Sequence, residues 1–157
     1  MALQELDKTG QLVTDISTII QVDVNQFAGI EYDEFAVRVA EVAMWLIDHQ
    51  MNIKVSNTFG QYFVRLPLKK SAKIVNGNAL RIDWEEVISK EKLNFILGNP
   101  PFVGHHYQNF DQKEDLKLVL DKIIGSGVMD YVSAWFYKSA QFIQSTKIKV
   151  EYPTAFK

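Results

Sequence analysis

Two consecutive prolines limit what the second half of the chain can form. Pro100 and Pro101 follow the apolar residues 93–97 and the dipeptide Gly98-Asn99. Because proline has no backbone N–H and a fixed φ, the pair cannot continue a hydrogen-bonded ladder and holds an extended turn. The sequence therefore predicts a brief strand over residues 93–97 that ends in a rigid loop at Asn99-Pro100-Pro101-Phe102.

Strand-like and helix-like segments alternate along the chain. The apolar run at residues 27–32 predicts a strand, and Asp33 is placed to cap a helix over residues 34–50. The wide apolar face of this helix is typical of a helix packed against a sheet. It consists of a stripe of Phe35, Val39, Val42 and Leu46, with Ala36, Ala40, Ala43 and Ile47 beside it. Further strands are expected at 62–66 and 147–152, a strand that runs into a loop at 73–80, and further helices at 3–12, 83–90, 113–124 and 129–144.

This alternation predicts an α/β fold with a mainly parallel sheet flanked by helices. In such folds, ligands bind beyond the carboxyl ends of the strands. Glu31 and Asn99 both lie at the end of a predicted strand. The two turns are therefore expected to carry the site.

Composition narrows the function classes. With 157 residues, 47% of them hydrophobic, the chain has enough material for one compact core. A net charge of -2 gives no bulk electrostatic reason for tight binding to DNA, and the lack of cysteine excludes disulfides, zinc–thiolate sites and thiol catalysis. No apolar run approaches the ~20 residues of a membrane span, and the N-terminal residues do not resemble a signal peptide. A soluble, cytoplasmic protein without a membrane partner is the expectation.

The proline loop has the groups needed to activate a nucleobase amine. Such an amine is a poor nucleophile, because its lone pair is delocalised into the ring. The amide oxygen of Asn99 and the carbonyl of Pro100 offer two acceptors for its N–H groups, and the prolines fix their direction. Phe102 is placed to stack on a base that has left the duplex. The alternative is a strand that ends in a structural proline turn, with Phe102 as an ordinary core aromatic.

The chain resembles the amino-methyltransferases that modify adenine N6 in DNA, specifically the large single-chain (type IIG) restriction-modification enzymes. The matching segments, besides the Asn99 loop, are residues 27–32, 43–52, 59–62, 65–68, 77–80 and 130–135. The resemblance implies an incomplete Rossmann-like class I methyltransferase fold, S-adenosylmethionine as cofactor, and double-stranded DNA with a flipped adenine as partner.

The resemblance also implies roles in cofactor binding. Glu31 would bind the ribose hydroxyls and Tyr32 would line the adenine pocket, while Asn78 and Ala79 would contact the cofactor adenine. Asn78 departs from the commoner aspartate of the family, although its carbonyl oxygen still accepts a hydrogen bond. Two alternatives stay open: Glu31 and Asp33 simply favour the start of the next helix, and residues 76–78 form only a tight turn.

Parts of the family's domain have no match in this sequence, namely the first central strand, its glycine-rich loop, the target-recognition domain and the nuclease. Residues 1–157 are therefore expected to be a partial catalytic domain that is inactive in isolation. In the family's strand order of 3-2-1-4-5, the unmatched strand lies between the strands predicted at 27–32 and 93–97. We expect either that these two close onto each other or that the chain self-associates through exposed sheet edges.

The remaining polar residues have simpler interpretations. His49, His105 and His106 lack suitably spaced partners, so no metal site is expected. The lysines and acids of residues 113–122, Asp115 included, are interpreted as a solvated helix face, and the aromatic residues 131 and 135–137 as core. Two other functions remain open: a non-enzymatic α/β binding or assembly module, and methylation of another planar amine or amide, in cytosine, RNA or protein glutamine.

Overall fold

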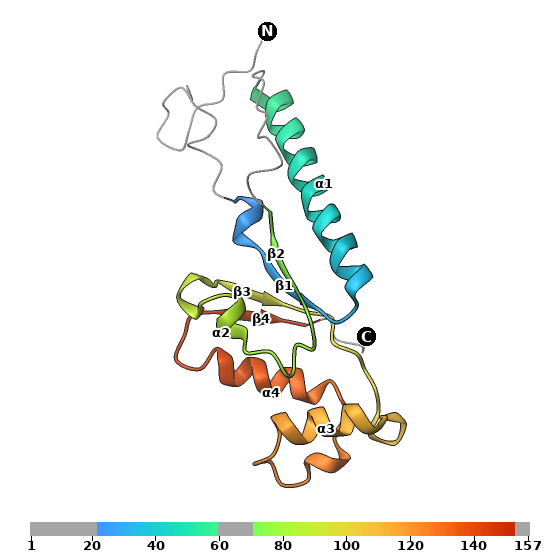
Figure 1. Ribbon diagram of the computed structural model, residues 1–157. Helices are drawn as coiled ribbons and strands as arrows, with labels where there is room; N and C mark the ends of the chain where they lie inside the picture. The colour runs from blue at the N-terminus through green and yellow to red at the C-terminus, as the bar shows by residue number, and fades with distance from the viewer. Residues whose placement is uncertain (1–21, 60–70, 153–157) are drawn as a thin grey trace. The chain divides into compact units, whose positions relative to one another are not determined.

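The computed structural model describes residues 22–59 and 71–152 (Figure 1). The chain divides into two compact units, residues 1–77 and 78–157. The segments expected at 3–12 and 62–66 lie outside the described residues. No helix in the described part of the chain is both long and apolar enough to cross a membrane.

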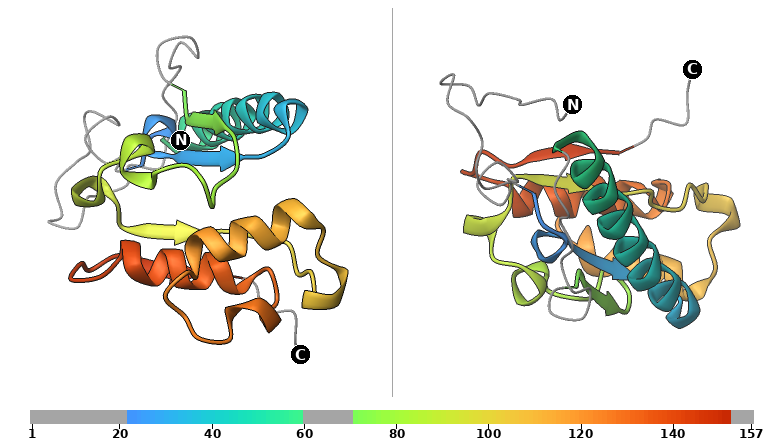
Figure 2. Two further views of the ribbon diagram at one scale, coloured as in Figure 1. Left: turned by 60° about the horizontal axis from the view of Figure 1, so that its bottom comes forward. Right: turned by 90° about the horizontal axis from the view of Figure 1, so that it is seen from above.

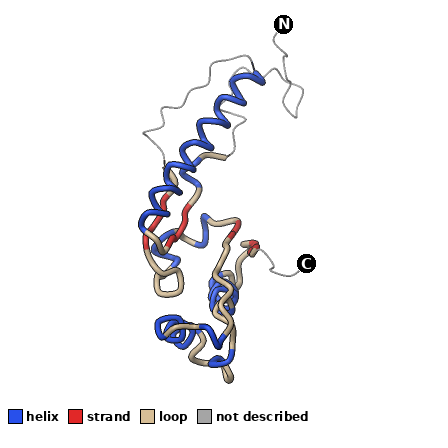
Figure 3. The backbone as a smooth tube through the Cα atoms, turned by 90° about the vertical axis from the view of Figure 1, so that its right-hand side faces the viewer, coloured by secondary structure: helices blue, strands red, loops and turns tan. Residues whose placement is uncertain are grey.

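The first unit pairs two parallel strands beside a long helix. Strand β1 (Ala28–Glu31) lies in register with β2 (Lys73–Asn76), with Ala28 opposite Lys73 and Glu31 opposite Asn76. The 3-10 turn η2 (Val24–Gln26) precedes β1, and helix α1 (Glu34–Phe59) follows it. Asp33 caps α1 as predicted, because its Oδ1 accepts a hydrogen bond of 2.9 Å from the Ala36 N–H. Figure 3 shows α1 continuing well past the end of the strand pair.

The packing face predicted for α1 was wrong in its main stripe, although Ala36, Ala40 and Ala43 beside that stripe are partly buried. Phe35, Val39, Val42 and Leu46 are 77, 51, 56 and 43% exposed, whereas Val37 is buried. The physical reason is width: two strands of four residues each cover only the side of the helix that carries Val37. The helix also runs nine residues beyond its predicted end, to Phe59.

The second unit pairs β3 (Phe95–Leu97) with β4 (Lys149–Glu151), again in parallel. Its helices are α2 (Trp84–Val87), α3 (Phe110–Val119) and α4 (Ser133–Phe142), with 3-10 turns η3 (Lys90–Lys92), η4 (His105–Tyr107) and η5 (Ser126–Val128). Helix α4 runs along the strand pair, and α3 lies beside α4 (Figures 1 and 2). The hydrophobic core lies between α3, the start of α4 and the loop before α2; it comprises Leu80, Leu116, Leu120, Tyr131 and Ala134.

Helix α3 begins three residues earlier than predicted, because Asn109 caps it. The Asn109 side chain accepts from the Gln112 N–H at 2.8 Å, and the Gln112 side chain accepts from the Asn109 N–H at 3.0 Å. This reciprocal pair satisfies two backbone donors that a helix start otherwise leaves free. Among the aromatic residues assigned to the core, Tyr131 is buried, but Phe136 is 46% exposed and meets the Tyr152 ring edge-on instead.

The α/β class with parallel pairing is confirmed, but the described strands form two separate two-stranded sheets. Closure of the strand before Asn99 onto the strand that ends at Glu31, and self-association as its alternative, both stay predictions. Each of the two strands has its parallel partner within its own unit.

Candidate functional site

The proline loop begins where the sequence predicts it. Strand β3 ends at Leu97, and the Gly98 N–H donates one further bond, of 3.3 Å, to the Glu151 carbonyl. Asn99 is exposed and Pro100 is buried. Neither the Asn99 side chain nor the Pro100 carbonyl makes a hydrogen bond with any residue that the structure describes. Neither acceptor therefore has a hydrogen-bond donor among the described residues.

The start of this loop is closely packed. A Cβ atom added to Gly98 would lie 2.7 Å from Tyr152 Cε1, so the tyrosine ring covers the glycine. Pro101 is exposed, and Phe102 is 48% exposed. A half-exposed ring does not fit the alternative that Phe102 is a core aromatic.

The far end of the loop is anchored by residues that come from before α3 and before α4. The Val103 carbonyl accepts from the Tyr131 N–H at 2.9 Å and from Gln108 Nε2 at 3.3 Å. Gln108 is buried and also donates to the Met129 carbonyl at 2.9 Å, while Asp130 Oδ1 accepts from the His105 N–H at 3.1 Å. The loop is therefore held at both ends, and Asn99 lies between the two anchors.

Asn78 and Ala79 lie in a second loop of the same unit, and this loop is held by side chains from three helices. Asn78 Oδ1 accepts from the Leu80 N–H at 2.9 Å, and Asn78 Nδ2 donates to Asp115 Oδ2 at 2.8 Å. The Ala79 carbonyl accepts from Trp84 Nε1 at 2.8 Å and from Lys138 Nζ at 2.8 Å. The hydrogen-bonded turn runs over residues 78–81, where the Asn78 backbone carbonyl accepts from the Arg81 N–H at 2.9 Å, and not over residues 76–78. The Asn78 side chain is also engaged outside this turn.

Lys138 binds three carbonyls of this loop. Its Nζ donates to Ala79, to Leu80 at 2.9 Å and to Ile82 at 2.6 Å. Burial lowers the pKa of the Lys138 ammonium below its usual value. The lysine therefore acts as a link between α4 and the loop rather than as a solvated charge.

Asp115 is the acidic centre of the second unit, and the sequence interpretation missed it. It is only 2% exposed, and its carboxylate accepts from Asn78, from Arg81 Nε at 2.6 Å and from the Tyr131 hydroxyl at 2.6 Å. Burial by itself raises the pKa of Asp115, but the hydrogen bonds from these three donors outweigh it and hold the pKa below its usual value. Burial, reinforced by the bond to Asp115, raises the pKa of the Tyr131 hydroxyl.

A signal for Asp115 was present in the sequence. The acid lies beside Leu116 and four residues before Val119, on the helix face that packs into the core. A charged residue within an apolar stripe predicts a buried polar contact. The assignment of Asp115 to the solvated face was wrong because that reading considered the neighbouring lysines and not the helical register.

Glu31 and Tyr32 lie at the carboxyl end of β1, in the first unit. Glu31 is partly buried; its Oε1 accepts from the Asp33 N–H at 3.1 Å, and its other carboxylate oxygen makes no hydrogen bond with the described residues. Asn76 Nδ2 donates to the carbonyls of Glu31 and Tyr32, at 3.2 and 3.0 Å, and fixes the turn. The Tyr32 side chain is 77% exposed.

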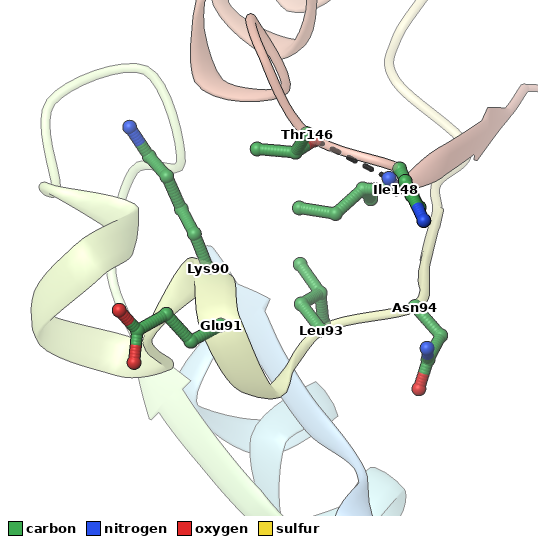
Figure 4. Close-up of a pocket in the computed structure, with 7 residues that line it drawn as sticks. Lys90, Glu91, Leu93, Asn94, Thr146 and Ile148 are labelled. Carbon is green, nitrogen blue, oxygen red and sulfur yellow. Dashed lines mark hydrogen bonds between the residues drawn. The ribbon is translucent and has the colours of Figure 1, made fainter.

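A shallow cavity of about 300 Å³ lies at the opposite end of the β3–β4 pair from Asn99 (Figure 4). Leu93, Asn94 and Ile148, which line it, all precede a strand. It is therefore separate from the candidate site. In the described ranges no three histidine, aspartate or glutamate side chains gather to hold a metal ion.

Comparison with known proteins bears on this geometry. The sequence model described as the DNA-methyltransferase domain of MmeI matches residues 2–155. The chain belongs to this family.

Two relatives of the MmeI methyltransferase-domain family show the extent of the similarity. DNA methyltransferase A of Bacillus subtilis (strain 168) is 32% identical over 155 residues, which are 97% of this chain and 18% of that protein. The solved structure of the type IIL restriction-modification enzyme MmeI in complex with DNA matches with a TM-score of 0.83 and 48% identity, over 92% of this chain and 20% of that one. The chain thus spans about a fifth of the length of these relatives.

The predicted resemblance to DNA methyltransferases of restriction-modification enzymes is confirmed. The roles assigned to Glu31, Tyr32, Asn78, Ala79 and the Asn99 loop remain predictions. The structure places the first two in one unit and the rest in the other. Within the second unit, Asp115 and Tyr131 connect the Asn78 loop with the Asn99 loop.

Proposed function

We propose that this chain is part of a DNA methyltransferase that transfers a methyl group from S-adenosylmethionine to adenine N6, within a restriction-modification system. One observation carries the proposal: Asn99 Oδ1 and the Pro100 carbonyl are two acceptors on a proline-fixed loop, and no described residue occupies either. They match the two N–H groups of an exocyclic amine in number and type.

The loop acts on the amine by accepting both of its hydrogen bonds. Electron density is thereby kept on the nitrogen, whose lone pair becomes available as the nitrogen turns more pyramidal. Since Pro100 and Pro101 fix the backbone, the acceptors do not have to reorient during the reaction. The exposed ring of Phe102 supplies a stacking surface for a base outside the duplex, which offsets part of an unstacking cost of a few kcal/mol.

The end of β1 and the Asn78 loop, each taken by itself, carry groups that suit the adenosine half of the cofactor. Glu31 has a carboxylate oxygen that no described residue engages and that suits ribose hydroxyls, and Tyr32 offers an exposed ring. The side-chain carbonyl of Asn78 already accepts from the Leu80 N–H, which leaves one lone pair for an amino group. Ala79 offers a small apolar surface beside it. S-adenosylmethionine, when bound, supplies the electrophilic methyl group.

We assign DNA binding mainly to other parts of a larger polypeptide. The net charge of -2 gives little attraction for phosphates, and the relatives are about five times longer than this chain. We propose a type IIG arrangement, in which target-recognition and nuclease segments belong to the same cytoplasmic protein and the Rossmann-like sheet is completed outside the described strands. We propose self-association through exposed sheet edges only for the isolated chain.

The test is methyl transfer from labelled cofactor to unmethylated DNA by the full-length protein, with the modified base mapped. Asn99→Ala is expected to lower the rate by about 10²–10³-fold, the loss typical of removing one preorganised hydrogen-bonding group, while DNA binding is retained. Thr58→Ala, a change of an exposed polar residue near the end of α1, serves as the control. If the product is methylcytosine, or if the methyl group is transferred to RNA or protein, the proposed substrate, adenine in DNA, is wrong. A wild type inactive on all of these would favour the binding module.

A further inference from the structure

The two loops that carry proposed site residues in the second unit are joined through one pair of side chains, neither of which belongs to the proposed site. Tyr131 donates its backbone N–H to Val103 at the end of the Asn99 loop, at 2.9 Å. Its hydroxyl donates to Asp115 Oδ2 at 2.6 Å, and the same oxygen accepts from Asn78 Nδ2 at 2.8 Å. Two side-chain hydrogen bonds, the covalent frame of Tyr131 and one backbone hydrogen bond therefore connect Asn78 to Val103.

We propose that Asp115 and Tyr131 are positioning residues for methyl transfer. In this role the Asp115–Tyr131 pair fixes the acceptors of Asn99 and Pro100 relative to the Asn78-Ala79 segment. The inference rests on the proposed function, because it concerns the groups that would hold the amine and the cofactor adenine.

The burial of the pair makes the link rigid. Asp115 and Tyr131 are 2 and 5% exposed, and Tyr131 packs with Leu80, Leu116 and Ala134 in the core. The Tyr131 ring also meets Trp135 edge-on, with ring centroids 4.8 Å apart. Water has little access to such a site, so a lost donor leaves the carboxylate short of a hydrogen bond instead of being replaced by solvent.

Stability alone does not require this arrangement. Well-packed apolar side chains in place of buried charged groups often leave stability unchanged or raise it. The carboxylate instead fixes the positions of the two loops relative to each other. Two of its donors, Asn78 and Arg81, come from one loop, and the third, Tyr131, is the residue that binds the other loop.

The consequence for the reaction follows from how strictly acceptors must be placed. A displacement of about 1 Å of a positioned group can lower a rate by roughly 10²-fold. A loss of the Tyr131 hydroxyl is therefore expected to slow methyl transfer, although no atom of Tyr131 touches the substrate in the proposed reaction.

The test compares Tyr131→Phe with Tyr137→Phe in the full-length protein. Tyr137 lies on α4, which begins two residues after Tyr131, and it packs against the core, but its hydroxyl makes no hydrogen bond with the described residues. For Tyr131→Phe we expect single-turnover methylation about 10- to 100-fold slower at saturating DNA and cofactor, an unchanged Kd for DNA, and faster amide exchange in both loops, 78–82 and 98–104. For Tyr137→Phe we expect none of these changes.

A second variant, Asp115→Asn, distinguishes loss of the link from a general loss of folding. Asp115→Asn keeps the size of the side chain but turns one acceptor into a donor that faces other donors. Combined with Tyr131→Phe, it should slow the reaction by much less than the product of the two single effects, because both remove the same link.

Several results would overturn the proposal. One is a full methylation rate in Tyr131→Phe with reduced stability only, and another is an equal loss in Tyr137→Phe. If the wild type itself does not methylate any substrate, the proposed function and the role in methyl transfer fall together. Amide exchange then decides on the link alone: it stands if Tyr131→Phe loosens both loops and fails if it loosens neither.

Discussion

The Tyr131 hydroxyl donates a 2.6 Å hydrogen bond to a carboxylate oxygen of Asp115 in the core of the second unit. The bond requires a protonated phenol and an ionised acid. The bond therefore helps to lower the pKa of Asp115. The pKa of Tyr131 is raised by burial and, in addition, by the same bond.

The raised pKa of Tyr131 predicts a loss of stability at alkaline pH. A tyrosine in the unfolded chain titrates near pH ~10, and the folded chain keeps Tyr131 protonated to higher pH. The stabilisation is therefore fully present below pH ~10 and is lost as the pH rises through the folded pKa. Urea unfolding between pH ~8 and ~12 should show a steeper decline for wild type than for Tyr131→Phe. Tyr137→Phe should decline like the wild type, and Tyr152, whose pKa burial also raises, contributes equally in all three.

Gly98→Ala should destabilise the second unit by about 1–3 kcal/mol, the usual cost of overpacking. The new methyl group would lie 2.7 Å from Tyr152 Cε1, so the ring must move and give up its edge-on contact with Phe136. Gly127→Ala is the matched control, because a Cβ there meets no atom within 4 Å. Equal unfolding midpoints for the two variants would show that Tyr152 does not confine Gly98.

Lys138→Met should destabilise the Asn78 loop by roughly 1.5–3 kcal/mol, the range for hydrogen bonds to a charged group. The methionine fills similar space but leaves the carbonyls of Ala79, Leu80 and Ile82 without this donor. Chemical unfolding and the amide exchange of residues 78–82 measure the effect. Lys122→Met, at an exposed lysine, should change neither; a comparable loss there would point to the general effect of removing a charge.

Glu31→Gln should weaken binding of S-adenosylmethionine by about 10-fold, which corresponds to one charge-assisted hydrogen bond of ~1.4 kcal/mol. Titration calorimetry on the full-length protein gives the Kd. Glu34→Gln, in the first turn of α1, is the control for a simple effect of charge at the helix start. If the two variants lose stability alike and bind the cofactor like the wild type, Glu31 serves the helix and not the ligand.

Local features of the fold could be predicted where a single residue type dictates the backbone. The consecutive prolines set the end of β3, and Asp33 set the start of α1. Helix ends were less predictable, because caps such as the Asn109–Gln112 pair depend on side-chain geometry and because α1 continues without a breaker to Phe59. The burial of the α1 stripe was predicted wrongly, since it depends on how wide a sheet the strands form.

The candidate site divides in the same way. The Asn99 loop was visible as a motif, because its chemistry lies in adjacent residues. The groups that hold the Asn99 and Asn78 loops were not visible, because Tyr131 binds Val103, 28 positions away, and Lys138 binds Ala79, 59 positions away. Asp115 was within reach of prediction from its helical register alone. Contacts between residues so far apart in the sequence depend on tertiary packing. The periodicity of a single segment does not predict that packing.

The shared oxygen of Asp115 also bears on how this domain can diverge over evolutionary time. Asn78 and Tyr131 donate to the same atom, so a substitution at any of the three positions alters the acceptor available to the other two. The three positions are therefore expected to covary among homologues: lineages that lack the phenol should also have replaced the acid or the amide. Drift at these positions would proceed in compensated steps, while neighbours such as Lys117 and Lys122 change freely.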